Sequence, residues 1–123
     1  MIKATRKQIG NDGEFRASEY LLQHGYTIIA RNWRTRRGEI DIIAEKEDIL
    51  VFVEVKTLPS GDSLTLAHEL GKQKQKRISE TAKCFLVNNR KYSKNYIRFD
   101  VIVVDMPGFD PIYHIENAFS GSL

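Results

Sequence analysis

The chain has 123 residues, of which 41% are hydrophobic and 28% are charged, and its formal net charge is +3. This balance is typical of one folded globular domain covering residues 1–123, and it excludes a disordered chain. No apolar run reaches the roughly 18 residues of a membrane span, and no apolar stretch follows the basic N-terminus as in a secretory signal, so we expect a cytoplasmic protein outside membranes.

The first half of the chain predicts one helix and three strands. A helix is indicated at residues 14–24, where capping residues precede apolar residues at helical spacing and Gly25 follows. Runs of β-branched and aromatic residues then indicate strands at residues 26–30, 39–44 and 49–56. Both alternating sets of side chains in the third run are apolar, which is typical of a central strand covered on both faces.

The second half predicts one long helix and two strands. After a loop at residues 58–63, apolar residues at helical spacing indicate an amphipathic helix over residues 66–86. Strands follow at residues 97–104 and 112–115. A helical connection favours parallel pairing of the third and fourth strands, whereas the tight turn before the third strand favours an antiparallel hairpin. The order αβββαββ therefore predicts an α/β fold with a mixed central sheet flanked by helices.

Two opposite charges end the apolar third strand. Glu54 and Lys56 project from the same face of that strand, and burying such charges costs several kcal/mol per ion unless a partner or a metal compensates. If Asp41 lies opposite Glu54 on the paired strand, the two carboxylates converge on one hard cation, with the Val55 carbonyl as a further oxygen ligand. The pattern predicts a site for Mg²⁺ or Mn²⁺.

Such a site suits phosphodiester hydrolysis. The metal lowers the pKa of an attacking water and stabilises the charge that develops on the phosphate. Lys56 beside the metal can orient the water or neutralise that charge. Glu14 in the first helix is a fourth candidate and a possible ligand of a second metal, because helical spacing places it on the side of Ala17 and Leu21, which we expect to face the sheet.

Each of these residues also has a structural interpretation. Glu54 and Lys56 can simply pair with each other. Glu14 can complement the positive end of its helix dipole, and Asp41 can act as a turn former at a strand edge. The sequence leaves these alternatives open.

Basic residues gather on either side of this acidic centre and suggest contacts with a polyanion. The candidates for phosphate contacts are Arg31, Arg34, Arg36, Arg37, Lys72, Lys74, Lys76 and Arg77. Ordinary solvated surface charge is the alternative for any one cluster. Either Gln73 or Gln75 can reach a metal-bound water, and the sequence does not choose between them.

Other conspicuous residues favour structural roles. For Trp33 we expect packing rather than stacking on an unpaired base, and for Cys84 packing within a helix. Asp100 interrupts an apolar strand beside Arg98, which favours an ion pair. His114 has no Cys or second His at zinc spacing, so we do not expect it to bind a metal.

The chain resembles the YraN family of small bacterial proteins, which in turn resemble endonucleases of the Holliday-junction-resolvase type. The resemblance covers nearly the whole chain, and its most specific segments are residues 13–14, 31–34, 38–44, 51–57, 98–101 and 114–119. It implies a restriction-endonuclease-like PD-(D/E)xK fold with the motif's acids at Asp41 and Glu54, its lysine at Lys56, and the helical acid at Glu14. Ile40 stands where the motif name has Pro. Analogy with resolvases also suggests a homodimer.

Two hypotheses of function follow from different classes of protein. The first is a Mg²⁺-dependent endonuclease that acts on branched, flapped or single-stranded DNA. The second is a nucleic-acid-binding or protein-interaction module that keeps the nuclease scaffold without turnover. The sequence does not distinguish DNA from RNA.

Overall fold

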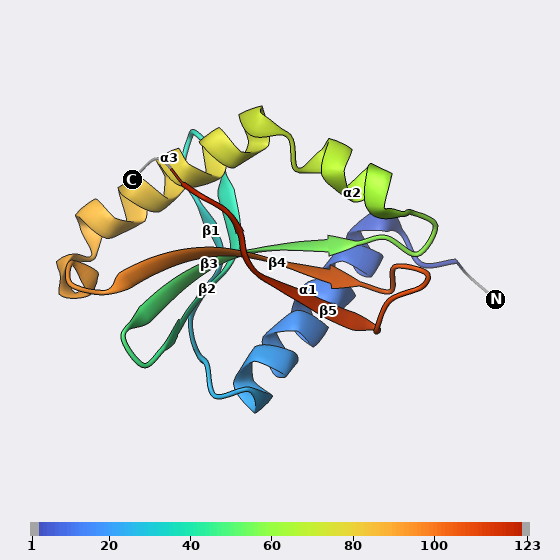
Figure 1. Ribbon diagram of the computed structural model, residues 1–123, viewed down its shortest axis with the longest axis horizontal. Coiled ribbons are helices and arrows are strands. Elements are labelled where there is room, and N and C mark those ends of the chain that lie inside the picture. Colours follow the sequence, from blue (N-terminus) through green and yellow to red (C-terminus); the bar gives the residue numbers. More distant parts are fainter. Residues whose placement is uncertain (1–2, 122–123) are drawn as a thin grey trace.

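The computed structural model describes residues 3–121 (Figure 1). In chain order, the elements are α1 (Arg6–Gln23), β1 (Thr27–Arg34), β2 (Glu39–Lys46), β3 (Ile49–Thr57), α2 (Ser63–Glu69), α3 (Lys72–Asn88), the 3-10 helix η1 (Arg90–Tyr92), β4 (Tyr96–Val104) and β5 (Ile112–Phe119). Within the described range, no helix combines the length and the apolar character that crossing a membrane requires.

The five strands form one sheet in the order β1-β2-β3-β4-β5. β1, β2 and β3 pair antiparallel in succession, β3 and β4 pair parallel, and β4 and β5 pair antiparallel. The parallel pair needs a crossover, which α2, α3 and η1 supply. The structure therefore confirms the predicted hairpin, the predicted parallel pair and the mixed sheet.

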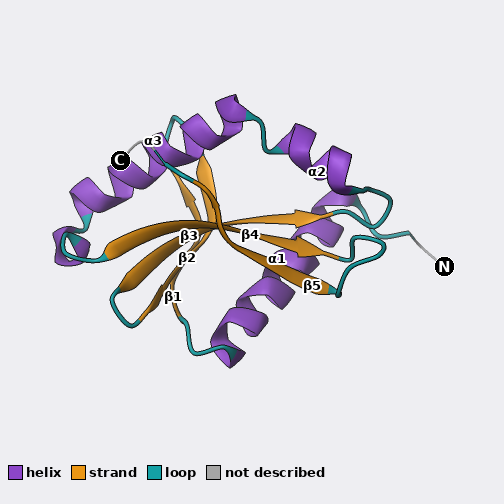
Figure 2. Cartoon of the chain, in the orientation of Figure 1, coloured by secondary structure: helices purple, strands orange, loops and turns teal. Residues whose placement is uncertain are grey.

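Helices cover both faces of the sheet (Figure 2). On one face, Leu21 of α1 and Val53 of β3 belong to the same buried core. On the other face, Phe85 of α3 packs against Phe52 of the same strand. Burying an apolar side chain of this size contributes about 1.5–3 kcal/mol. Two cores share one central strand, and this is the predicted restriction-endonuclease-like arrangement of a mixed sheet between helices.

The first helix begins at Arg6, eight residues before the predicted start at residue 14. Thr5 forms a capping box in which its side chain accepts from the Gln8 backbone N–H at 3.1 Å and its own N–H donates to Gln8 Oε1 at 2.7 Å. The prediction was wrong because two glycines and polar residues at positions 10–13 hide the helical pattern. Gly13 lies against β3, where an added Cβ would clash with Thr57 Oγ1.

The largest of the other differences from the prediction concern β1, the long helix and β5. β1 continues to Arg34, because an edge strand tolerates the charged residues that follow Ala30. The predicted helix over residues 66–86 is two helices, α2 and α3, which are separated at residues 70–71, where Gly71 is the N-cap of α3. β5 continues to Phe119 rather than ending at residue 115.

Candidate metal centre

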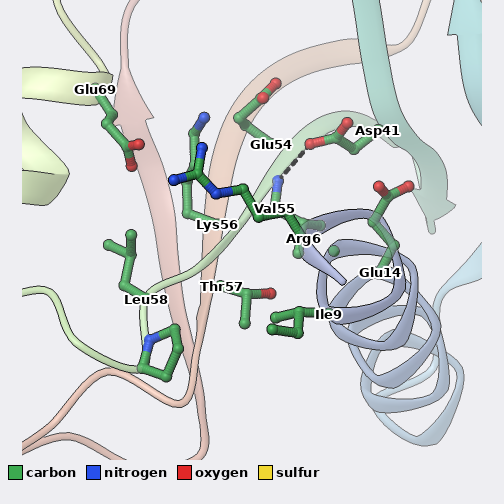
Figure 3. Close-up of a pocket in the computed structure, with 12 residues that line it drawn as sticks. Arg6, Ile9, Glu14, Asp41, Glu54, Val55, Lys56, Thr57, Leu58 and Glu69 are labelled. Atoms are coloured by element: carbon green, nitrogen blue, oxygen red, sulfur yellow. Dashed lines mark hydrogen bonds between the residues drawn. The ribbon is translucent and has the colours of Figure 1, made fainter. Parts of the chain in front are cut away.

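Asp41 and Glu54 lie at the end of the β2-β3 ladder. The last paired residues there are Ile42 and Val53, so Asp41 and Glu54 are the next residue along each strand. Past Ile42 and Val53, a side chain continues the link between the two strands: Asp41 Oδ2 accepts a hydrogen bond of 2.8 Å from the Val55 N–H (Figure 3). The structure thus brings the two carboxyls together, and the Asp41 carboxyl is held against the backbone of β3.

Glu54 is a buried acid with incomplete hydrogen bonding. Its residue is 5% exposed, and Lys74 Nζ lies 3.5 Å from its Oε1. Its Oε2 is buried and has no hydrogen-bond partner among the described residues. Burial, and after it the Asp41 charge, raise the pKa of Glu54 from 4.5 to about 8, although Lys74 and Lys56 act to lower it. At pH 7 this carboxyl is mostly protonated unless a cation binds beside it.

The neighbouring acids have raised pKa values as well. Burial is the main cause that raises the pKa of Asp41, and the hydrogen bond from Val55 opposes it. Burial also raises the pKa of Glu14 on α1, and the charges of Asp41 and Glu39 add to this effect. Perturbed carboxyls that gather beside a pocket are typical of functional sites.

Asn32 links two of these acids and was missed by the sequence reasoning. Its φ of 52° lies in the left-handed region, which is uncommon for residues other than glycine. With its amide nitrogen turned toward the acids, Asn32 donates to Glu14 Oε1 at 2.7 Å and to Glu39 Oε1 at 2.8 Å. The sequence offered one indication of this role, the residue type, because Asn adopts the left-handed conformation more readily than most other residues.

Two lysines flank the carboxyls. Lys56 is half-buried at the end of β3, and its charge acts to lower the pKa of Glu54. Lys74, in the first turn of α3, is the ion-pair partner of Glu54. Across residues 3–121, no ion pair joins Glu54 to Lys56, so mutual neutralisation of these two residues does not describe the site. Lys74, which the sequence assigned to phosphate binding, belongs beside the carboxyls.

The other two structural interpretations are also wrong. Glu14 lies eight residues after the start of α1, well beyond the first turn in which a helix dipole acts on a charge. Asp41 lies within β2 and not in a turn.

A pocket of about 600 Å³ opens beside these groups (Figure 3). Its lining includes the four predicted catalytic residues, Glu14, Asp41, Glu54 and Lys56. The rest of the lining is Arg6, Ile9 and Gly10 from α1, Val55 and Thr57 of β3, Leu58 and Pro59 directly after it, and Glu69 of α2. The sequence reasoning missed the α1 wall because the predicted helix began after it.

The donor set fits a divalent cation. Glu54 Oε2 is a buried oxygen without a partner, next to a second carboxyl. Mg²⁺ binds to proteins through one or two carboxylates and keeps waters and phosphate oxygens as its other ligands. Asp41, Glu54 and the Val55 carbonyl would hold such an ion, with Glu14 nearby. Among residues 3–121, no three His, Cys, Asp or Glu side chains are grouped so that together they could hold a metal ion. Glu14 therefore does not join Asp41 and Glu54 in one set of three carboxylates, and the candidate donors are the two carboxylates and the Val55 carbonyl.

The predicted phosphate contacts lie on two surfaces. Arg31, Arg34, Arg36, Arg37, Lys72, Lys76 and Arg77 are exposed, on β1 and its following turn and on α3. Arg34 Nε is 3.5 Å from Glu39, and Arg37 Nη1 is 3.8 Å from Glu80. The structure leaves most of these cations available to a ligand.

Neither predicted glutamine lines the pocket. Gln75 Nε2 donates to the Leu70 carbonyl at 2.8 Å, which fixes the turn between α2 and α3. Gln73 is exposed.

The expected packing roles agree with the structure. Trp33 packs edge-to-face on Phe85 with ring centroids 5.3 Å apart, so its predicted packing role is confirmed. Cys84 is half-buried on α3.

A second buried acid has a different environment. Asp100 is 0% exposed and accepts two hydrogen bonds of 2.8 Å from Arg98 and one of 2.9 Å from the Asn117 N–H, while His114 Nε2 lies 2.7 Å from its Oδ2. Burial acts to raise the pKa of Asp100, but the hydrogen bonds from His114, Arg98 and Asn117 together hold it below its usual value. The predicted pair of Arg98 and Asp100 is confirmed.

Replacing Glu54 with Gln is expected to flatten the pH dependence of stability. The folded wild type holds a proton on Glu54 up to about pH 8, whereas the unfolded chain loses it near 4.5. The wild-type free energy of unfolding therefore falls as the pH rises through this window, and it does so less in Glu54→Gln, which cannot ionise. Urea denaturation in EDTA below, within and above the window measures this. Equal declines in the two proteins would contradict it.

Comparison with known proteins places the chain in a family. The model described as "Uncharacterised protein family UPF0102" matches residues 13–104. A UPF0102 protein of Treponema pallidum (strain Nichols) is 50% identical over 117 residues, which cover 92% of this chain and 93% of the relative. Similar proteins from Treponema denticola and Mesorhizobium japonicum are 50% and 40% identical, over 90% and 97% of this chain and 94% and 90% of their own lengths. These matches confirm the resemblance to the YraN family, and the chain belongs to this family, UPF0102.

Proposed function

We propose that this protein is a Mg²⁺-dependent endonuclease that hydrolyses phosphodiester bonds in branched, flapped or single-stranded DNA. The main support is Glu54, a buried carboxyl with one oxygen unpartnered among the described residues, which stands beside Asp41 at the edge of an open pocket. A protein that needed this acid only for stability would satisfy both oxygens, because an unpaired buried polar atom costs about 1–3 kcal/mol.

The residues of the pocket have complementary roles in this reaction. A bound Mg²⁺ supplies an activated water and a positive charge against the phosphate. Asp41 and Glu54 hold the ion, and the hydrogen bond from Val55 keeps the Asp41 carboxylate in place. Lys56 presents its ammonium to the same pocket and neutralises charge on the phosphate or orients the water. Asn32 links Glu14 to Glu39 through its amide, which fixes the Glu14 carboxyl at the edge of the site.

The charge around the pocket favours a nucleic acid as substrate. Arg31 on β1 is close enough to act on the pKa of Glu14. On the other side, Lys74 joins the first turn of α3 to Glu54, and the exposed Lys72, Lys76 and Arg77 follow along this helix. Cations on both sides of an acidic centre match a strand of phosphates that binds across the metal.

The proposal is tested by cleavage and by metal binding together. Purified protein with Mg²⁺ or Mn²⁺ should cut flapped, branched or single-stranded DNA, and EDTA should abolish cutting. Calorimetry should detect Mn²⁺ binding that tightens as the pH rises toward about 8, because the ion displaces a proton from Glu54. Failure to cut any substrate of the panel, with no Mn²⁺ binding, would refute the proposal. Salt-sensitive DNA binding that persisted in that case would favour the inactive-module alternative.

A further inference from the structure

One face of α1 forms a wall of the pocket. Arg6, Gly10 and Glu14 are four residues apart in succession, so they share one side of the helix, and all three line the pocket. They cover about 12 Å along the helix axis. Glu14 stands at the carboxyl cluster, and Arg6 stands at the far end, where its side chain extends across the pocket (Figure 3).

Gly10 has no evident role in the packing of α1. Its φ is not positive, and an added Cβ would meet no atom within 4 Å. Gly13 differs, because an added Cβ there would clash with Thr57. A glycine inside a helix destabilises it relative to alanine. Gly10 therefore weakens α1 while leaving open space inside the pocket.

We infer that this space is the path of a single nucleic-acid strand, whose backbone next to the scissile phosphate crosses α1 at Gly10. The inference rests on the proposed function and names its substrate class. A missing Cβ lets a ligand approach the helix backbone closely. Arg6 binds a phosphate beyond the crossing point: it is exposed, and no ion pair neutralises it among residues 3–121.

The rest of the pocket selects an unpaired nucleotide. Ile9, Leu58 and Pro59 give it apolar walls, and its volume of about 600 Å³ suits one small-molecule-sized group. A duplex keeps its bases stacked inside and presents mainly phosphates at its surface. Only a nucleotide released from the duplex brings a sugar and a base to these apolar side chains. The substrate class is DNA with unpaired nucleotides beside the cut, such as a flap or a single-stranded branch.

The test fills the space without damaging the helix. In Gly10→Leu a side chain occupies the strand path, and Asn11→Leu places the same side chain on the adjacent, exposed position. Both changes improve helix propensity, so thermal unfolding should occur at equal or higher temperature than in wild type. Fluorescence anisotropy in EDTA with a labelled single-stranded oligonucleotide should give a Kd raised about tenfold or more for Gly10→Leu. The Kd of Asn11→Leu should stay at the wild-type value.

Arg6→Ala is the second variant. It should weaken binding and reduce the slope of log affinity against log salt by about 0.7, the value for one phosphate contact on a single strand.

The outcomes separate this inference from the proposed activity. Wild-type affinity in Gly10→Leu would overturn the strand path even if the protein cuts DNA, and so would a wild-type protein that binds no single strand. Weakened binding in a stable Gly10→Leu supports the path. If the wild type then cuts no substrate of the panel and binds no Mn²⁺, the nuclease proposal fails, and the result supports Gly10 only as a binding path for a single strand.

Discussion

Replacing Lys56 with Ala is expected to lower the rate of DNA cleavage by about 10²–10⁴-fold while leaving Mn²⁺ binding in place. Lys56 lines the pocket, and its ammonium group has no oxygen with which to bind the proposed ion. Its loss removes a positive charge from Glu54, whose pKa then rises further, so the Mn²⁺ affinity falls mildly at pH 7 and recovers at higher pH. Single-turnover cleavage and calorimetry on the same preparations measure both effects.

Two further variants make this test specific. Asp41→Ala removes a proposed metal ligand and should lose both cleavage and Mn²⁺ binding. Lys76→Ala removes the same charge as Lys56→Ala from an exposed position on α3, so it should only weaken DNA binding, most clearly at low salt. A Lys56→Ala protein that cuts DNA at the wild-type rate would exclude Lys56 from the chemistry.

The sequence predicted the part of the site that depends on local geometry. Side chains alternate along a strand, so charges at Glu54 and Lys56 at the end of an apolar run were visible without any knowledge of the fold. Asp41 could be placed beside them because the short acidic turn between the two runs predicted a hairpin, and the observed register puts it next to Glu54. The mixed sheet followed from the same reasoning about connections.

The rest of the site depends on contacts between distant segments. Lys74 reaches Glu54 only because the long helix predicted for residues 66–86 is broken at residues 70–71, so that a new helix begins beside the pocket. Arg6 joins the wall because a capping box at Thr5 starts α1 earlier than its apolar pattern suggests. Asn32 joins Glu14 through a left-handed backbone conformation, which periodicity does not reveal.

The two buried acids of the sheet, Asp100 and Glu54, differ in how their carboxyl oxygens are hydrogen-bonded. Asp100 is surrounded by donors, and these hold its pKa below the usual value. Glu54 keeps an oxygen without a partner among the described residues, and its pKa is raised to about 8. A satisfied acid stabilises the fold, whereas an unsatisfied one beside a pocket is suited to a ligand that completes its coordination. The stability of this protein should therefore depend far more on Asp100 than on Glu54.

Asp100→Asn is accordingly expected to lower the free energy of unfolding by about 3–5 kcal/mol, because it removes the buried counter-charge of the half-buried Arg98 and leaves only the exposed Glu116, at 3.9 Å. Asp105→Asn is the matched control: it breaks the pair of Asp105 with Arg16, at 2.7 Å, but on an exposed surface, and should cost less than about 1 kcal/mol. Because the pKa of Asp100 is lowered from 3.8, its stabilisation is present above that pH and is lost as the pH falls below it. Urea denaturation at neutral and acidic pH should show that the free energies of unfolding of wild type and Asp100→Asn converge in acid. A loss at neutral pH as small as that of Asp105→Asn would show that the buried cluster contributes little to the stability of the fold.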